Sequence, residues 1–236
     1  MAENTHWHRI LEGRAGLFAV LTTIAIAIGG IVEIVPMFAL QAREPVLEGI
    51  EPYTPLEVAG RDIYMREGCM LCHSQMIRPM RSETLRYGEW SRADEYRYDR
   101  PFLLGSRRIG PDLQRAGGKR SDDWHYEHMR DPRSTSPGSV MPPYPWLLEW
   151  QVDPEDIRAS VRTLQRLGHP YSDEEVAEVP ALMEAQGREI VGRLAERGIQ
   201  TEPDREIIAL IAYLQRLGVD GQRALDAQAA ASEGEE

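Results

Sequence analysis

Hydrophobic and polar residues divide the chain into one long apolar stretch near the N-terminus and a polar remainder with short helical patterns. From residue 15 to residue 40 the sequence is predominantly apolar, and Glu33 is its single charged residue. As a helix this stretch would be roughly 39 Å long, against a bilayer hydrocarbon core of about 30 Å. A signal peptide would have a shorter apolar region of about 7–15 residues. We therefore expect residues 15–40 to form an uncleaved transmembrane anchor.

Beyond the anchor, the periodicity predicts helices and no set of strands. Apolar spacing, capping residues and terminal glycines predict helices over residues 56–68, 121–130, 153–168, 172–180 and 201–218. Residues 74–118 are rich in Arg, Tyr, Gly and Pro and lack periodicity, which is typical of ordered loops. The predicted organisation is a stub (1–14), the anchor (15–40), a linker (41–55), a mainly α domain (56–218) with a helical insertion (151–200), and a flexible acidic tail (219–236).

The charge pattern excludes one class of partner and orients the anchor. The net charge is −11 and Lys119 is the only lysine among the basic residues, so we expect no nucleic-acid binding. Arg9 and Arg14 precede the anchor, whereas Arg43 beyond it is outnumbered by nearby glutamates. This arginine bias favours a cytoplasmic N-terminus and places the polar bulk of the chain on the outer side of the membrane.

The sequence CysMetLeuCysHis at residues 69–73 is the strongest chemical signal in the chain. Zinc would need four ligands, and a second tight pair of cysteines or histidines is not evident. A thioredoxin-like dithiol would need a βαβ context, which the pattern does not predict. Covalent haem accounts for each residue, since Cys69 and Cys72 would bind two vinyl groups and His73 would bind the iron. We therefore expect one covalently bound haem c.

A second axial ligand would make this haem a six-coordinate electron carrier. Met141 lies in a proline-stiffened segment, SerValMetProProTyrProTrp, far enough from His73 for the chain to wrap round a porphyrin. We expect Met141 to be this ligand. The spacing leaves Met80 and Met129 open as alternatives, and His125 or His128 is the main competing choice.

The motif order resembles that of class I cytochromes c: a helix, CysXXCysHis, GlyProAspLeu at residues 110–113, MetPro, and a terminal amphipathic helix. The resemblance implies that the first and last helices cross at Gly60, with Tyr64 and Tyr213 as packing partners. It also implies that the Pro111 carbonyl accepts a hydrogen bond from the His73 ring nitrogen that does not bind iron.

A narrower resemblance covers residues 60–146, including GRDIYMREGCMLCHSQMIRPMRSETLRYGEW and MPPYPWL. This block resembles the monohaem subunit, CcoO or FixO, of cbb3-type cytochrome c oxidases. The resemblance implies a single-pass protein of the bacterial inner membrane with a periplasmic haem domain. Its haem would take electrons from a dihaem cytochrome c subunit or a soluble cytochrome c. They would pass to haem b of the large haem-copper catalytic subunit, where O2 is reduced to water.

On this interpretation the chain is an electron-transfer subunit of an enzyme and performs no catalysis alone. The aromatic and arginine side chains between residues 78 and 108 would pack against the large subunit or pair with haem propionates. Three alternatives stay open: an anchored cytochrome that shuttles between complexes, the small subunit of nitric oxide reductase, and a ligand-binding haem sensor with an open sixth site. Co-purification with a large haem-copper subunit distinguishes the first two from an oxidase subunit, and carbon monoxide binding tests the third.

Overall fold

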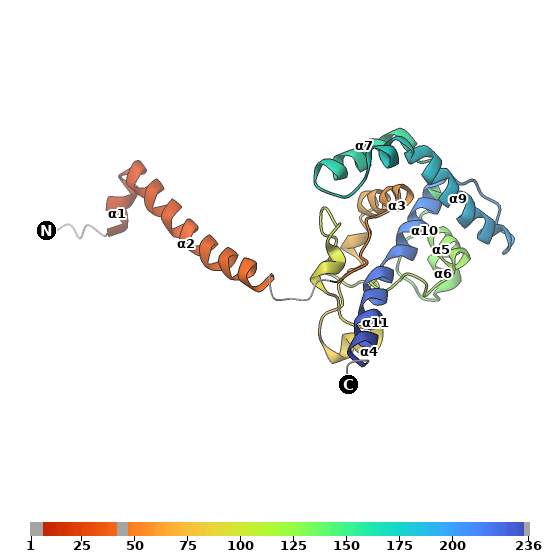
Figure 1. Ribbon diagram of the computed structural model, residues 1–236, viewed down its shortest axis with the longest axis horizontal. Helices are drawn as coiled ribbons and strands as arrows, with labels where there is room; N and C mark the ends of the chain where they lie inside the picture. The colour runs from red at the N-terminus through yellow and green to blue at the C-terminus, as the bar shows by residue number, and fades with distance from the viewer. Residues whose placement is uncertain (1–6, 42–46, 234–236) are drawn as a thin grey trace. The chain divides into compact units, whose positions relative to one another are not determined.

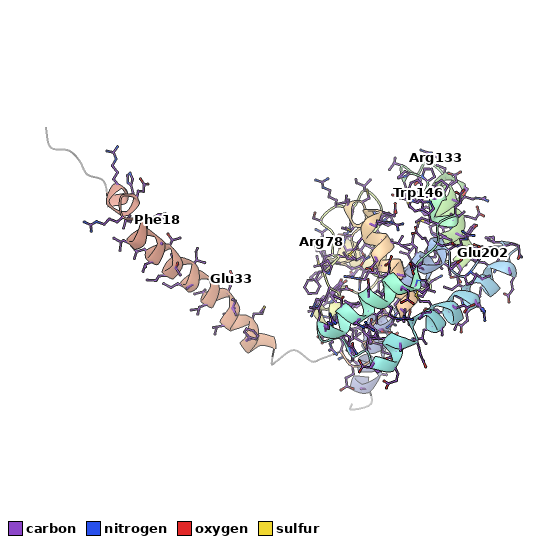
Figure 2. All side chains as sticks on the ribbon, turned by 90° about the horizontal axis from the view of Figure 1, so that it is seen from above. Phe18, Glu33, Arg78, Arg133, Trp146 and Glu202 are labelled. Atoms are coloured by element: carbon purple, nitrogen blue, oxygen red, sulfur yellow. The ribbon has the colours of Figure 1, made fainter. Side chains whose placement is uncertain are left out.

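The computed structural model describes residues 7–41 and 47–233 and separates into two units, residues 1–46 and residues 47–236 (Figure 1). The first unit contains α1 (Trp7–Glu12) and α2 (Ala15–Gln41). Within α2, Ala15–Phe38 is long and apolar enough to cross a membrane. The α2 side chains described are almost all exposed, including Phe18 and Glu33 (Figure 2). Residues 42–46 of the expected linker, with Arg43, lie outside the described residues.

The second unit is mainly helical, as predicted. Among its described residues the only strand-like pairing is an isolated antiparallel bridge between Gln151 and Arg205. Its α-helices are α3 (Pro55–Arg66), α4 (Arg81–Tyr87), α5 (Asp122–Arg130), α6 (Pro132–Thr135), α7 (Pro154–Arg166), α8 (Asp173–Ala177), α9 (Val179–Ala195), α10 (Glu206–Arg216) and α11 (Val219–Glu233). Three short 3-10 helices are η1 (Cys69–Leu71), η2 (Ala93–Tyr96) and η3 (Pro145–Leu148).

The crossing of α3 and α10 forms the centre of this unit (Figure 1). Thr54 caps α3 through a capping box with Glu57, and Pro55 occupies the first turn, which suits its fixed φ. At the crossing, Gly60 lies against the backbone of Ala209. An alanine at residue 60 would place its Cβ only 2.7 Å from the Tyr213 Cβ. The expected crossing at Gly60 is therefore present.

Tyrosines pack around the crossing and connect it to the chain after the cysteines. The rings of Tyr64 and Tyr213 have centroids 5.5 Å apart, and the Tyr53 ring is tilted against that of Tyr213 with centroids 5.7 Å apart. The Tyr213 hydroxyl and the Gln75 side-chain amide are hydrogen-bonded at 3.0 Å. Both Tyr64 and Tyr213 are fully buried, which matches their expected role as packing partners.

The segment 151–200 packs into the same core as α3 and α10. Helix α7 contacts α3, and α9 contacts α3, α7 and α10. Val161 of α7 and Leu194 of α9 are fully buried. Ser160 donates a hydrogen bond of 3.1 Å to Asp62 on α3. These helices are therefore part of the core of the second unit.

Two stretches differ from the sequence prediction of a linker and a flexible tail. Leu47 is buried, and its backbone N–H donates a 2.8 Å hydrogen bond to Asp94, so residues 47–55 already belong to the second unit. Residues 219–233 form helix α11, in which Asp220 is buried and pairs with Arg216. Apolar periodicity does not predict α11, because other contacts hold its first turn. These are the charge pairing of Asp220 and the close approach of Gly221 to the Glu95 side chain. Residues 234–236 of the predicted tail lie outside the described residues.

Replacing Gly60 by alanine is expected to lower the free energy of unfolding by about 1–3 kcal/mol, because the new methyl group would overlap the Ala209 carbonyl and force the helices apart. Gly192→Ala in α9 is the matched control, since nothing lies within 4 Å of the added Cβ. That control should be neutral or stabilising by up to about 1 kcal/mol. Urea unfolding of the full chain in mild detergent, followed by circular dichroism, measures both. Equal stabilities for the two variants would contradict the crossing.

Candidate haem site

One turn of the chain presents the two cysteines and His73. It begins directly after α3, where Gly68 has a positive φ of 70° and redirects the backbone. The N–H groups of Cys72 and His73 both donate to the Cys69 carbonyl, at 3.1 and 2.9 Å. Both cysteines are free thiols. The local fold thus gathers two thiols and an imidazole on one short turn.

A second segment, residues 110–113, meets this turn and orients the imidazole. The Gly110 N–H donates to the Cys72 carbonyl at 2.9 Å. His73 Nδ1 lies 2.9 Å from the Pro111 carbonyl oxygen, and because that oxygen can only accept, Nδ1 carries the proton. Nε2 is left as the nitrogen with a lone pair, the form that binds a metal. The contact implied by the resemblance is present; its role in ligation stays a prediction.

Glycine is the only residue type that, at position 110, leaves room for the His73 imidazole. A Cβ at residue 110 would overlap His73 Cε1 and lie 2.7 Å from Nδ1 and 2.8 Å from Nε2. His73 is half-buried, and burial lowers its pKa, opposed by the hydrogen bond to Pro111 and by the charge of Asp112. A lowered pKa keeps the ring neutral near pH 7 and available to iron.

The cysteine environment suits thioether formation better than thiolate chemistry. Burial, with a smaller contribution from Glu67, raises the pKa of Cys69 to about 12. A redox dithiol or a zinc site uses the thiolate, which this environment disfavours. Within residues 7–41 and 47–233, no group of three or more His, Cys, Asp or Glu side chains is placed to hold a metal ion. The residues on the turn fit a covalently attached haem.

Met141 lies in the loop between α6 and η3. It is half-buried and packs against the core cluster, as do Cys69, Met70 and Tyr144. Its backbone N–H donates to the Ser139 hydroxyl at 3.2 Å. The Tyr144 N–H donates to the Met129 carbonyl at 2.8 Å and ties this loop to the end of α5. Met141 therefore stays the predicted second ligand.

The competing methionines have different surroundings. Met129 is buried in the hydrophobic core, a role that its packing explains. Met80 precedes α4 and is 43% exposed. Neither the burial of Met129 nor the exposure of Met80 makes that residue a better candidate for the second axial ligand than Met141.

The two histidines of α5 differ from each other. His128 stacks on Trp124 with ring centroids 4.4 Å apart, and its Nδ1 lies 2.6 Å from the Thr135 hydroxyl. His125 is buried, and neither of its ring nitrogens has a hydrogen-bond partner among the described residues. Burial lowers the pKa of His125 to about 4, so the ring is neutral at pH 7.

Some of the arginines between residues 78 and 108, expected to contact a partner subunit or haem propionates, form ion pairs within the domain. Arg78 and Arg108 both pair with the buried Glu83, and Arg108 lies 5.3 Å from the Tyr87 ring centre. These contacts lower the pKa of Glu83 to about 2, mainly through the hydrogen bond from Arg108. Sequence reasoning identified Arg108 but not its carboxylate partners Glu83 and Asp112. No sequence spacing indicates these pairs, because they depend on the course of non-periodic loops.

A turn carrying two thiols and an imidazole held by a backbone carbonyl indicates a protein of the cytochrome c class. The comparison with family models agrees: residues 8–220 match the family described as cytochrome c oxidase, mono-heme subunit/FixO. The chain belongs to this family, as the sequence resemblance predicts. It is thus a one-haem subunit of a cytochrome c oxidase, and the matched range includes the apolar helix α2 that would anchor it in a membrane. A search of curated proteins gives no match.

Gly110→Ala is expected to displace the His73 ring from the Pro111 carbonyl, because the added methyl group overlaps the imidazole. Losing this orienting contact typically weakens metal ligation 10- to 100-fold. The haem-loaded variant should keep its covalent haem stain but show a weakened low-spin absorption spectrum. Gly192→Ala should leave the spectrum unchanged. A wild-type spectrum in Gly110→Ala would contradict the proposed position of the imidazole.

Acid should destabilise the chain through His125. The pKa of His125 is lower in the folded chain than in the unfolded chain. Its contribution to the free energy of unfolding is therefore fully present above about pH 6.5 and is lost as the pH falls towards 4. Between pH 7 and pH 5 the expected loss from this group is about 2 kcal/mol. His125→Phe should reduce the loss by about that amount in urea titrations at the two pH values. An identical pH dependence in variant and wild type would show that His125 is not buried in the neutral form.

Proposed function

We propose that this chain is a membrane-anchored c-type cytochrome that carries electrons within a cbb3-type oxidase. The donor would be a dihaem cytochrome c subunit or a soluble cytochrome c. The acceptor would be haem b of the large haem-copper subunit, which reduces O2 to water. The observation that carries the proposal is the turn of residues 69–73, with His73 held by the Pro111 carbonyl at 2.9 Å.

The residues of the turn would hold the haem in a defined way. Each thiol, Cys69 and Cys72, would add its sulfur to one carbon of a vinyl group and its hydrogen to the other, which forms two thioethers without an external oxidant. His73 would bind iron through Nε2 while Nδ1 donates to Pro111. Met141 would supply a thioether sulfur as the second iron ligand. When bound, the haem would supply one-electron redox chemistry.

The protein around the turn would fix the ligands and exclude water. Tyr64 of α3, the helix that leads into the turn, is fully buried, and burial raises its pKa well above the ordinary value, so its hydroxyl stays protonated. The Trp146 indole donates to Glu67 at 3.2 Å and links the Met141 loop to the end of α3. The two predicted axial ligands are therefore carried by segments that are joined through α3.

The membrane orientation is part of the same proposal. Arg9 and Arg14 lie on the N-terminal side of α2 and favour a cytoplasmic N-terminus in the bacterial inner membrane. The second unit, with the candidate haem site, would then be periplasmic. The candidate haem site and a soluble cytochrome donor would then share one compartment.

Purification of the membrane complex through this subunit tests the oxidase function. A denaturing gel should show covalent haem in a band near 26.8 kDa, and the complex should contain b-type haem and consume oxygen. A stained band that emerges without b-type haem would support an independent electron shuttle. An unstained band would show that the turn does not attach haem.

Met141→Ala tests the second ligand. Covalent staining should persist, since both cysteines are intact, whereas the reduced haem of the full chain should bind carbon monoxide through the vacated sixth position. Electron flow to oxygen in the complex should fall at least tenfold. Met80→Ala, at an exposed position, is the matched control and should resemble the wild type. No carbon monoxide binding by Met141→Ala would assign the sixth position to another residue.

A further inference from the structure

Asp112 is a buried carboxylate that ties together the two segments of the candidate haem site. Its Oδ2 accepts hydrogen bonds from the Ser74 hydroxyl at 2.6 Å and from the Met76 N–H at 2.9 Å. Its Oδ1 accepts from the Gln114 N–H at 2.9 Å. The side chain has 0% exposed surface. Asp112 thus holds the chain just after His73 against the chain just after Pro111.

Arg108 is the cation that compensates this carboxylate. Its Nη2 lies 3.2 Å from Asp112 Oδ2, 2.8 Å from Glu83 and 2.7 Å from the Met76 carbonyl. Its Nε donates to the Ser74 hydroxyl at 2.6 Å. The guanidinium therefore uses its planar fork to contact four groups at once, which a lysine could not reproduce.

These contacts fix the carbonyl that orients His73. Pro111 lies between Gly110, whose N–H is bound to the Cys72 carbonyl, and Asp112. The Leu113 N–H donates to the Ser74 carbonyl at 2.8 Å and closes the pairing on the other side. The Pro111 carbonyl cannot move away from the imidazole without breaking contacts on both sides.

The charge of Asp112 acts on the imidazole, since it raises the pKa of His73 against the larger effect of burial, and Arg108 lies 3.2 Å from this carboxylate. Oxidation of an iron bound to His73 would add one positive charge on the imidazole side of Asp112, and Arg108 partly offsets the charge of that carboxylate. A buried carboxylate stabilises that charge, and the arginine opposes it, because such interactions are weakly screened away from water. Hydrogen bonding and charge around the axial ligand are among the ways a protein sets a haem potential.

We propose that Asp112 is a positioning residue for His73, and that the Asp112–Arg108 ion pair sets the reduction potential of the iron that His73 binds. The inference rests on the proposed function, since it requires haem at residues 69–73. It assigns to the segment 108–114 a second role besides supplying the Pro111 carbonyl.

Two substitutions that change the charge in opposite directions provide the test. Asp112→Asn keeps an oxygen that can accept from Ser74 and Met76 but removes the negative charge, so the reduction potential should rise. Arg108→Gln leaves the carboxylate uncompensated, so the potential should fall. The double variant restores the net charge and should lie between the two. The readout is a potentiometric titration of the haem c absorption of the full, haem-loaded chain in detergent.

Asp220→Asn is the matched control. Asp220 is also a buried aspartate paired with an arginine, Arg216, but its described contacts are to Arg216, Arg223 and the Glu51 N–H, none of them in the haem site. Its substitution should change stability without shifting the potential. A loss of packing alone would therefore not reproduce the Asp112→Asn result.

The outcomes separate this inference from the proposed function. A potential that is unchanged in Asp112→Asn, or that shifts no more than in Asp220→Asn, would overturn the inference while leaving haem binding intact. If Arg108→Gln does not accumulate, the comparison of the two aspartate variants still decides the result. A wild-type chain without covalent haem would overturn the proposed function itself, and the inference with it.

Discussion

The close approach of α3 and α10 at Gly60 determines where the parts of the candidate haem site lie. Helix α3 ends directly before the turn of residues 69–73, so its direction sets the direction of the turn. Helix α10 contacts the chain on the other side of that turn, through the hydrogen bond between Tyr213 and Gln75. Helix α3 thus fixes the start of the turn, and α10 fixes the chain that follows it. A side chain at residue 60 would separate the two supports.

Buried pairs of arginine and carboxylate hold the loops that surround this helical centre. Arg108 pairs with Asp112 and Glu83, while Arg115 pairs with Glu95 beside α11. Removing one partner of such a buried pair commonly costs about 3–5 kcal/mol, because the other charge is left without compensation. These loops have little apolar periodicity and cannot be held by a hydrophobic face. The preference for arginine over lysine agrees with this use, since the guanidinium can bind several acceptors in fixed directions.

The sequence predicts the features that depend on neighbouring residues. The capping box at Ser172 and the apolar faces of α7 and α10 have local signals, and the helices α8, α7 and α10 are present. The cysteine turn is a local motif as well. By contrast, the Asp112 contacts depend on the course of two loops, and α11 has no wide apolar face. Sequence patterns cannot show such long-range pairing before the fold is known.

The helices of residues 151–200 affect the site through α3. Helices α7 and α9 both pack against α3 and shield it from water. Val161 and Leu194 are fully buried, and Gln186 of α9 lies 2.7 Å from the Thr54 hydroxyl at the start of α3. Well-packed interiors resist small displacements, so a helix covered in this way moves less than an exposed one. Since electron transfer requires ligands held in one geometry in both redox states, the additional helices serve the same purpose as the crossing at Gly60: they keep the base of the cysteine turn fixed.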